Sequence, residues 1–142
     1  MIKQNIVFVE NKAGSLKRVT GLLANNNINI YGFACFDAPE FAIFRMICDD
    51  PDKAEIILNQ SGYMNRITQA IVVDMKDQVG GLDELLKIMA DSNVSLDYIY
   101  TSFHRKDLRP AVILHSEDIT VTESVLKNNG FKVFSAADEL EK

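Results

Sequence analysis

The chain of 142 residues is 47% hydrophobic and carries a formal net charge of −5 at pH 7. This apolar content is enough for a buried core and excludes global disorder, while the acidic balance argues against sequence-independent binding to nucleic acid. No apolar run reaches the roughly 18 residues of a membrane-spanning helix, and no export signal follows Met1, so we expect a cytoplasmic protein with neither a membrane nor a nucleic-acid partner.

The spacing of apolar residues predicts the order of elements in the first half of the chain. Continuous apolar runs indicate strands, apolar residues at helical spacing indicate helices, and Pro39 indicates a turn because proline fixes φ and lacks a backbone donor. The predicted elements are a strand over residues 4–9, a helix over 15–26, strands over 28–35 and 41–48, a helix that starts at 49–52 and stops at Ser61, and a strand over 63–67.

The second half of the chain repeats this order. A shift of 66 residues aligns the two halves without a gap over residues 14–30, and beyond a longer turn the shift becomes 68. The matched pairs include Gly14 with Gly80, Leu23 with Met89, Ile30 with Leu96 and Gly62 with Gly130. Internal repetition of this kind is strong evidence about architecture. It predicts two similarly folded domains, over residues 1–68 and 69–142.

Each predicted domain has four strands and two helices in the order βαββαβ. Right-handed crossovers place both helices on one face of the sheet, which is the ferredoxin-like arrangement of the α+β class. The other face of the sheet and the strand edges then need cover. We therefore expect the two units to pack side by side, on one another or within a homo-oligomer.

A tight turn joins the first predicted strand to the first predicted helix, over residues 10–16. Gly14 allows a positive φ, and Asn11 can hydrogen-bond its own backbone two residues on. The turn leaves the first amides of a helix unpaired, and such a helix start suits a carboxylate or a phosphate. The same device returns at residues 77–82.

The charges around the two turns differ. The first turn is surrounded by basic residues and the second by acidic ones, namely Lys12, Lys17 and Arg18 against Asp77, Asp83 and Glu84. Acidic residues in a first helical turn complement the helix dipole and repel an incoming carboxylate. If the protein binds an amino acid, we expect the first turn to hold its carboxylate, and the acids of the second unit to suit its ammonium group.

The two turns and the strands that follow them resemble a known family. The first copy reads Glu10-Asn11-x-x-Gly14-x-Leu16 with Ile28-Asn29-Ile30, and the second reads Asp77-x-x-Gly80-x-Leu82 with Val94-Ser95-Leu96. This pattern is similar to that of the ACT domain, so the chain resembles a stand-alone tandem ACT protein. The resemblance implies a regulatory module that binds small ligands, usually amino acids, in the seam between two units. Such modules control metabolic enzymes or transcription regulators.

The resemblance also implies which positions contact the ligand. They fall on the turn of one unit and on the polar residue that opens the second strand of its neighbour. The candidate ligand-binding residues are Asn11, Lys12, Ala13, Gly14, Ser15, Leu16, Asn29, Asp77, Gly80, Gly81 and Ser95. Ala13 and Val79 stand where many members of the family carry proline. For Asn11, a structural role in its turn and a ligand contact stay equally open, because both use the same side chain.

The sequence contains no catalytic constellation, metal site or cofactor motif. His104 and His115 have neither a cysteine nor a carboxylate partner at metal-ligand spacing. No pair of side chains combines an activated nucleophile with a positioned base. We therefore expect a protein without enzyme activity, metal or cofactor.

Two further groups of residues have an ordinary structural interpretation. The basic residues Arg105, Lys106 and Arg109 could grip an anionic partner, but a solvated hairpin tip is favoured. Cys35 and Cys48 lie in apolar runs, and we expect them to be reduced thiols in the core.

These observations favour a non-catalytic regulatory protein that binds an amino acid or a similar small metabolite. One concrete form is the regulatory subunit of an amino-acid biosynthetic enzyme, such as acetolactate synthase, with that enzyme as partner. The alternative is a protein–protein interaction module that pairs through its sheet edges and binds no metabolite.

Overall fold

The computed structural model of the chain describes residues 1–103, 105–107 and 109–141. The chain divides into two compact units. The N-terminal unit consists of Lys3–Thr68, and the C-terminal unit combines Met1–Ile2 with Gln69–Lys142. Strand β4 (Asn65–Asp74) contributes its first residues to the N-terminal unit and the rest to the C-terminal unit.

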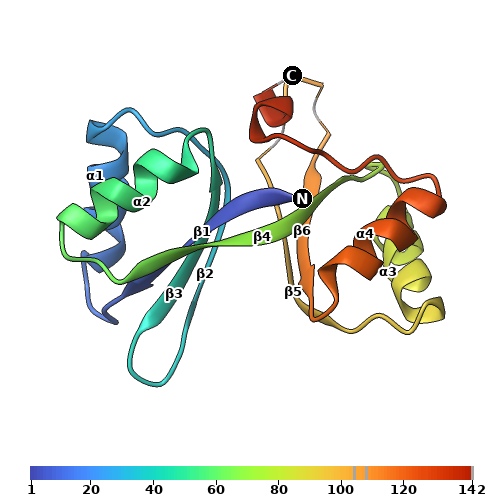
Figure 1. Cartoon of the computed structure of the whole chain (residues 1–142), viewed down its shortest axis with the longest axis horizontal. Helices are drawn as coiled ribbons and strands as arrows, with labels where there is room; N and C mark the ends of the chain where they lie inside the picture. Colours follow the sequence, from blue (N-terminus) through green and yellow to red (C-terminus); the bar gives the residue numbers. More distant parts are fainter. Residues whose placement is uncertain (104, 108, 142) are drawn as a thin grey trace. The chain divides into compact units, whose positions relative to one another are not determined.

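The N-terminal unit is an antiparallel sheet with two helices on one face (Figure 1). Strand β3 lies between β1 and β2, and Met64, the residue before β4, accepts a hydrogen bond at its backbone oxygen from Phe8 N of β1 at 3.0 Å. Besides the first residues of β4, its elements are β1 (Ile2–Val9), α1 (Ser15–Asn25), β2 (Ile30–Asp37), β3 (Ala42–Cys48) and α2 (Pro51–Gln60).

The C-terminal unit has the same arrangement. Strand β6 pairs antiparallel with β4 and β5, and a single bridge between Val73 and Val133 stands in place of a full fourth strand. Its elements after β4 are α3 (Gly81–Asp91), β5 (Leu96–Thr101), β6 (Ala111–Ser116), α4 (Ile119–Asn128) and the short 3₁₀ helix η1 (Ala137–Glu141). The two units confirm the predicted ferredoxin-like α+β fold with its repeated βαββαβ order.

The second helix of each unit begins at a capping aspartate. Asp50 Oδ1 accepts a hydrogen bond from Lys53 N at 3.1 Å, and Asp118 Oδ1 accepts one from Val121 N at 3.2 Å. Each cap satisfies a backbone donor that the helix itself leaves unpaired, which is worth about 1 kcal/mol. Pro51 occupies the first helical position of α2, where a missing N–H costs nothing.

The chain leaves the first helix of each unit through an asparagine with positive φ. Asn27 has φ 58° and Asn93 has φ 57°, and the two are equivalent in the repeat. Asparagine tolerates this left-handed conformation better than other residues with a Cβ. The strand that follows begins at Ile30, two residues later than the predicted start at residue 28.

Each unit buries its own hydrophobic core between the sheet and the helices. In the N-terminal unit the core includes Val7, Val9, Val19, Leu23, Phe44, Met46, Cys48 and Leu58. In the C-terminal unit it includes Ile71, Val73, Leu85, Met89, Val112, Leu114 and Leu126. A fully buried side chain of this kind contributes roughly 1.5–3 kcal/mol, so the repeated helical spacing of Val19 with Leu23 and of Leu85 with Met89 accounts for helix docking in both units.

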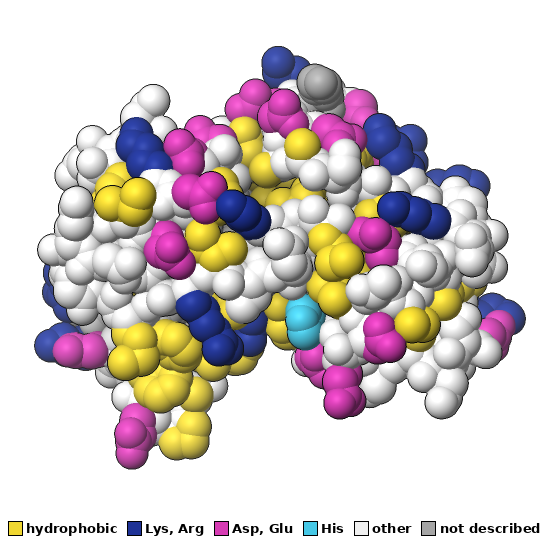
Figure 2. Space-filling view, viewed as in Figure 1, with side chains coloured by type: hydrophobic (Ala, Val, Ile, Leu, Met, Phe, Trp, Pro, Cys, Tyr) yellow, Lys and Arg dark blue, Asp and Glu magenta, His cyan; other side chains and the backbone are white. Residues whose placement is uncertain are grey.

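Strand β2 is more exposed than its apolar sequence suggests. Phe33 and Phe36 are each 45% exposed, and Cys35 between them is exposed as well. The expectation that both cysteines lie in the core is therefore wrong for Cys35 and right for Cys48. Figure 2 shows hydrophobic side chains gathered over the β2–β3 hairpin, at the lower left of the view. The cause is position, because β2 is the edge strand of its unit.

Among the described residues, no helix is long and apolar enough to cross a membrane.

Candidate functional site

The turn before α1 has the predicted backbone. Gly14 is the N-cap of α1 with φ 83°, which confirms the expected left-handed conformation. Ser15 N donates to Lys12 O at 3.2 Å and Arg18 N donates to Gly14 O at 3.0 Å. No side chain caps this helix and its first turn contains no acidic residue. The start of α1 is therefore electropositive and open to an anionic group.

Asn11 acts differently from the prediction. Its Nδ2 donates to Ala38 O at 3.3 Å, in the connection between β2 and β3, and the side chain is exposed. The expected hydrogen bond to its own backbone two residues on is not the one formed. Asn11 instead ties the turn to the β2–β3 hairpin.

A cleft of about 270 Å³ adjoins this turn within the N-terminal unit. Its walls are the end of β1, the start of α1 and the connection from α2 to β4. It is lined by Phe8, Val9, Glu10, Lys12, Ser15, Arg18, Gly62, Tyr63 and Met64. Of the candidate residues in this turn, Lys12 and Ser15 line the cleft, whereas Asn11, Ala13, Gly14 and Leu16 do not.

The charged groups of the N-terminal cleft have partners within it. Lys12 Nζ lies 2.7 Å from Glu10 Oε2, and this hydrogen-bonded contact lowers the pKa of the Glu10 carboxyl group. Arg18 Nη2 donates to Ser15 Oγ at 3.2 Å. Two cations and one carboxylate line the cleft, so it carries an excess of positive charge.

The turn before α3 repeats the backbone but not the charges. Gly80 is the N-cap with φ 85°, and no side chain caps α3, but Asp83 and Glu84 lie in its first turn. Gly81 is required for packing, because a Cβ there would lie 2.2 Å from the carbonyl oxygen of Lys76. Approaches below 3 Å do not occur at real Cβ atoms, so the start of α3 can pack against the Lys76 backbone only as glycine.

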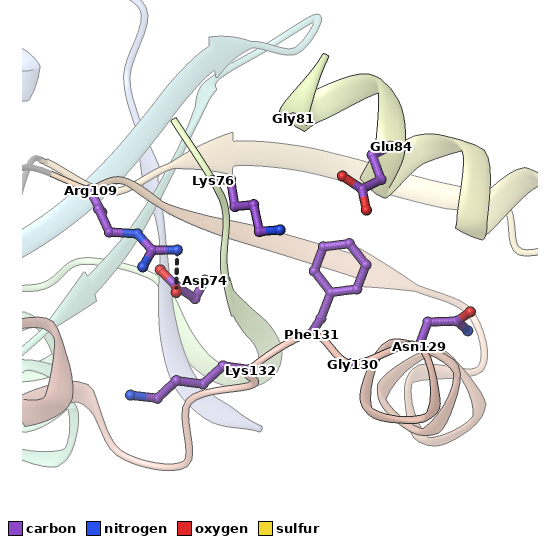
Figure 3. Close-up of a pocket in the computed structure, with 9 residues that line it drawn as sticks. All are labelled: Asp74, Lys76, Gly81, Glu84, Arg109, Asn129, Gly130, Phe131 and Lys132. Carbon is purple, nitrogen blue, oxygen red and sulfur yellow. Dashed lines mark ion pairs between the residues drawn. The ribbon is translucent and has the colours of Figure 1, made fainter. Parts of the chain in front are cut away.

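A second cleft, of about 280 Å³, lies at the equivalent place in the C-terminal unit (Figure 3). It is lined by Asp74, Lys76, Gly81, Glu84, Arg109, Asn129, Gly130, Phe131 and Lys132. Of the predicted residues in this turn, Gly81 lines the cleft, whereas Asp77 and Gly80 do not. The sequence did not predict the wall formed by residues 129–132. A signal for it was present, because Gly62-Tyr63 matches Gly130-Phe131 in the repeat and the two segments line equivalent clefts.

The two clefts have opposite charges at two equivalent positions. Glu10 in the first cleft corresponds to Lys76 in the second, and Arg18 corresponds to Glu84. A ligand with one positive and one negative end would therefore lie in opposite directions in the two clefts.

Asp74 forms one wall of the C-terminal cleft and is held by two arginines. Arg105 Nη2 lies 2.5 Å from Asp74 Oδ1, and Arg109 Nη2 lies 2.8 Å from Asp74 Oδ2. Arg105 is 8% exposed, and its guanidinium group also stacks over the Phe134 ring at 5.0 Å. The expectation of a solvated tip is therefore wrong for Arg105, whose charge is buried and paired. His104, in the same loop, lies outside the described residues.

Asn29 and Ser95 lie at the other end of the first helix of each unit. Each is the residue immediately before its strand. Between it and Gly14 or Gly80 lies the first helix of the unit, which has 11 residues and is roughly 16 Å long. Asn29 N donates to Asp49 Oδ1 at 3.0 Å. Ser95 lines a separate cleft of about 310 Å³ together with Glu117 and Asp118. Neither residue lines the cleft of its own turn.

His115 has a carboxylate neighbour that its position in the sequence did not indicate. Its Nδ1 lies 2.8 Å from Asp97 Oδ2 on the paired strand β5, and its ring stacks on Tyr98 with centroids 5.4 Å apart. Within residues 1–103, 105–107 and 109–141, no group of three or more histidine, cysteine, aspartate or glutamate side chains could hold a metal ion.

Comparisons with known proteins agree with this architecture. The family model described as an ACT domain pair matches residues 1–140. The crystal structure of protein BT0572 from Bacteroides thetaiotaomicron is similar, with 29% identity, a TM-score of 0.88, and coverage of 99% of this chain and 96% of that chain. No curated protein sequence matches the chain.

Two more distant structures share the fold. The ligand-free regulatory subunit of aspartate kinase from Thermus thermophilus has 14% identity and a TM-score of 0.63, with 90% of this chain and 91% of that chain covered. The regulatory subunit of aspartate kinase from Thermus flavus has 13% identity and a TM-score of 0.58, with 89% and 91% covered.

Proposed function

Because this chain belongs to the ACT domain pair family, we propose that it is a non-catalytic regulatory protein that binds an amino acid or a similar small metabolite. The protein partner is a metabolic enzyme, and the concrete form is a regulatory subunit of an amino-acid biosynthetic enzyme such as acetolactate synthase. The chain works as a cytoplasmic homo-oligomer that transmits ligand occupancy to this partner. Two regulatory subunits of aspartate kinase, from two Thermus species, share the fold, which supports a regulatory role.

The observation that carries the proposal is the N-terminal cleft at the start of α1. Lys12 and Arg18 bring positive charge to a helix start that has neither a capping side chain nor an acidic first turn. A carboxylate placed there meets Arg18 and the hydroxyl of Ser15, in a field that the helix dipole reinforces. The Glu10 carboxylate on the same wall suits the ammonium group of the same ligand. The volume of about 270 Å³ suits a metabolite the size of an amino acid.

The state of the two thiols supports a non-catalytic protein. Burial raises the pKa of the Cys48 thiol to about 12, and the partial desolvation of the more exposed Cys35 thiol raises its pKa as well. A nucleophilic cysteine needs the opposite shift, because the thiolate is the reactive form. Neither thiol is therefore activated as a nucleophile at neutral pH.

One observation favours the alternative of a pure interaction module. Phe33 and Phe36 are exposed on the edge strand β2, next to backbone groups that a second strand could pair with. In that case the protein associates with a partner through this edge and has no ligand affinity at the α1 start.

A ligand screen followed by one pair of variants separates the two functions. A thermal-shift screen across the twenty amino acids identifies ligands, because binding to the folded state raises the melting temperature. Calorimetric titration of the best ligand then compares Arg18→Gln with Lys17→Gln, which removes the same charge from the neighbouring exposed position outside the cleft. We expect Arg18→Gln to weaken binding at least tenfold and Lys17→Gln less than threefold. Equal effects of the two variants contradict a site at this cleft.

A further inference from the structure

The C-terminal cleft contains two opposite charges that face each other without forming a pair. Figure 3 shows the ammonium group of Lys76 and the carboxylate of Glu84 directed toward the same space beside the Phe131 ring. Among the described residues, neither side chain forms a hydrogen bond or an ion pair. Their bonding capacity is therefore available, and a ligand with a carboxylate and an ammonium group matches both ends at once.

The rest of the cleft adds positive charge. Asp74 is shared by Arg105 and Arg109, at 2.5 Å and 2.8 Å, and Arg105 Nη2 also lies 3.5 Å from Asp107 Oδ2. The ammonium group of Lys132 lies 5.0 Å from the Phe134 ring centroid, and Lys132 also lines the cleft. The cleft is lined by three cations, Lys76, Arg109 and Lys132, and by two carboxylates, Asp74 and Glu84. This excess of positive charge favours a ligand that carries a second anionic group in addition to its zwitterionic pair.

The equivalent N-terminal cleft shows that this open pair is not imposed by the fold. There, Glu10 is bonded to Lys12 at 2.7 Å and Arg18 to Ser15 at 3.2 Å, so both charged groups already have partners. The start of α3 does not need Glu84 for its dipole, since Asp83 already places a carboxylate in that first turn. Glu84 is therefore free to serve a ligand.

We propose that the C-terminal cleft binds an α-amino acid with an acidic side chain. Its ammonium group lies at Glu84, one carboxylate at Lys76, and the second carboxylate toward Arg109 and Lys132, with the aliphatic part against Phe131. This ligand lies in the opposite direction to one in the N-terminal cleft, because the charges of the two clefts are inverted. The proposal depends on the C-terminal unit alone and is independent of the function proposed for the N-terminal cleft.

Calorimetric titration of the full chain with L-glutamate, glutarate and L-lysine tests this site. Glutarate keeps both carboxylates of glutamate but lacks the ammonium group, and L-lysine replaces the acidic side chain with a basic one. To remove any contribution from the N-terminal cleft, each titration is done in the wild type and in an Arg18→Gln background. The expected result is that L-glutamate binds at least tenfold more tightly than L-lysine.

Two variants of the cleft, each with a matched control, identify the contacts. Lys76→Met should weaken L-glutamate binding at least tenfold, whereas Lys87→Met, which removes the same charge on the exposed side of α3, should change it less than twofold. Glu84→Gln should weaken L-glutamate binding about tenfold but leave glutarate binding equal or tighter, because only glutamate has an ammonium group to lose. Asp83→Asn, in the same turn but outside the cleft, should affect both ligands alike and weakly.

Several results overturn the proposal. They are a wild-type chain that does not bind L-glutamate, equal effects of Lys76→Met and Lys87→Met, or an equal loss of glutamate and glutarate binding in Glu84→Gln. The two sites fail separately. If Arg18→Gln removes all amino-acid binding while Lys76→Met removes none, the N-terminal site stands and the C-terminal site is wrong. The reverse pattern supports the C-terminal site and contradicts the N-terminal one.

Discussion

Arg105 and Asp74 are 31 residues apart in the sequence, yet Arg105 Nη2 lies 2.5 Å from Asp74 Oδ1. The side chains are 5% and 15% exposed, so both charges have left bulk water. The Nε of Arg105 also donates to Arg109 O at 3.0 Å, so this side chain bonds both within the loop between β5 and β6 and to Asp74 at the end of β4. This loop forms part of the wall of the C-terminal cleft.

Removing the buried carboxylate should destabilise the protein far more than removing the exposed arginine. Asp74→Ala leaves the Arg105 guanidinium buried without its main partner, and breaking a buried pair in this way costs about 3 kcal/mol or more. Arg109→Ala removes a side chain that is 43% exposed, and Asp74 keeps Arg105, so the cost should be about 1 kcal/mol or less. Urea denaturation of the two variants measures the difference. Similar losses in both would show that Arg105 does not depend on Asp74.

Two helical glycines should respond in opposite ways to alanine. Gly81→Ala places a Cβ 2.2 Å from Lys76 O, which is backbone and cannot move aside cheaply, so we expect a loss of about 1–3 kcal/mol of stability. Gly21→Ala in α1 places its Cβ 3.0 Å from Lys17 Nζ, the end of a flexible side chain. Since alanine is the better helix former, Gly21→Ala should be neutral or stabilising by up to about 1 kcal/mol. Thermal unfolding of both variants tests this contrast, and a neutral Gly81→Ala would contradict the close approach.

The two turn glycines should have equal effects on folding and unequal effects on binding. Gly14 and Gly80 have φ of 83° and 85°, so valine at either position costs roughly 1–3 kcal/mol of stability. Gly14→Val should weaken amino-acid binding at the N-terminal cleft, whereas Gly80→Val should leave it unchanged within threefold. Calorimetric titration with the best ligand of the screen makes this comparison. If only Gly80→Val lost binding, the ligand carboxylate would lie at the second turn, and its assignment to the first turn would be wrong.

The neighbouring polar positions should follow the same asymmetry. Asn11→Ala removes the hydrogen bond to Ala38 O that ties the first turn to the β2–β3 hairpin, and a neutral hydrogen bond of this kind is worth about 0.5–1.5 kcal/mol. We expect a loss of amino-acid affinity of that order at the N-terminal cleft. Asp77→Ala, the matching change in the second turn, should have less effect there. If Asp77→Ala lost binding and Asn11→Ala did not, the ligand carboxylate would have to be assigned to the second turn instead of the first.

Alkaline pH should destabilise the protein through Cys48. Burial raises the pKa of this thiol from its ordinary value near 9.0 to about 12, so the folded state holds the proton more tightly than the unfolded state. The stabilising effect is complete below pH 9 and is lost as the pH rises through 12, by up to about 1.4 kcal/mol per pH unit. Urea unfolding at pH 8 and pH 10 should therefore show a larger loss for the wild type than for Cys48→Ala. Parallel losses would mean that Cys48 does not titrate differently in the two states.

The features that the sequence determined by itself are those set by local spacing. Apolar residues three and four apart predicted α1 within a residue of its observed end, and the repeat placed α3 at the equivalent position, because one helical face must be buried whatever the partner. The repeated glycines predicted the left-handed caps at Gly14 and Gly80, since few other residues adopt that conformation. The inverted charges at Arg18 and Glu84 were also visible, because they stand at the same place in the repeat.

Tertiary structure alone decided which of these residues share a site. The connection after the second helix of each unit forms one wall of its cleft. Tyr63 and Phe131, which lie in these connections, come close to the first turn only in the folded unit. The side chain of Asn11 donates a hydrogen bond to the β2–β3 hairpin, and Asp74 forms an ion pair with Arg105, which is distant in the sequence. Cys35 became exposed because β2 lies at the sheet edge. Hydrogen bonds, ion pairs and burial between distant segments depend on which segments are brought together in the folded chain. The spacing of residues that are neighbours in the sequence does not determine this.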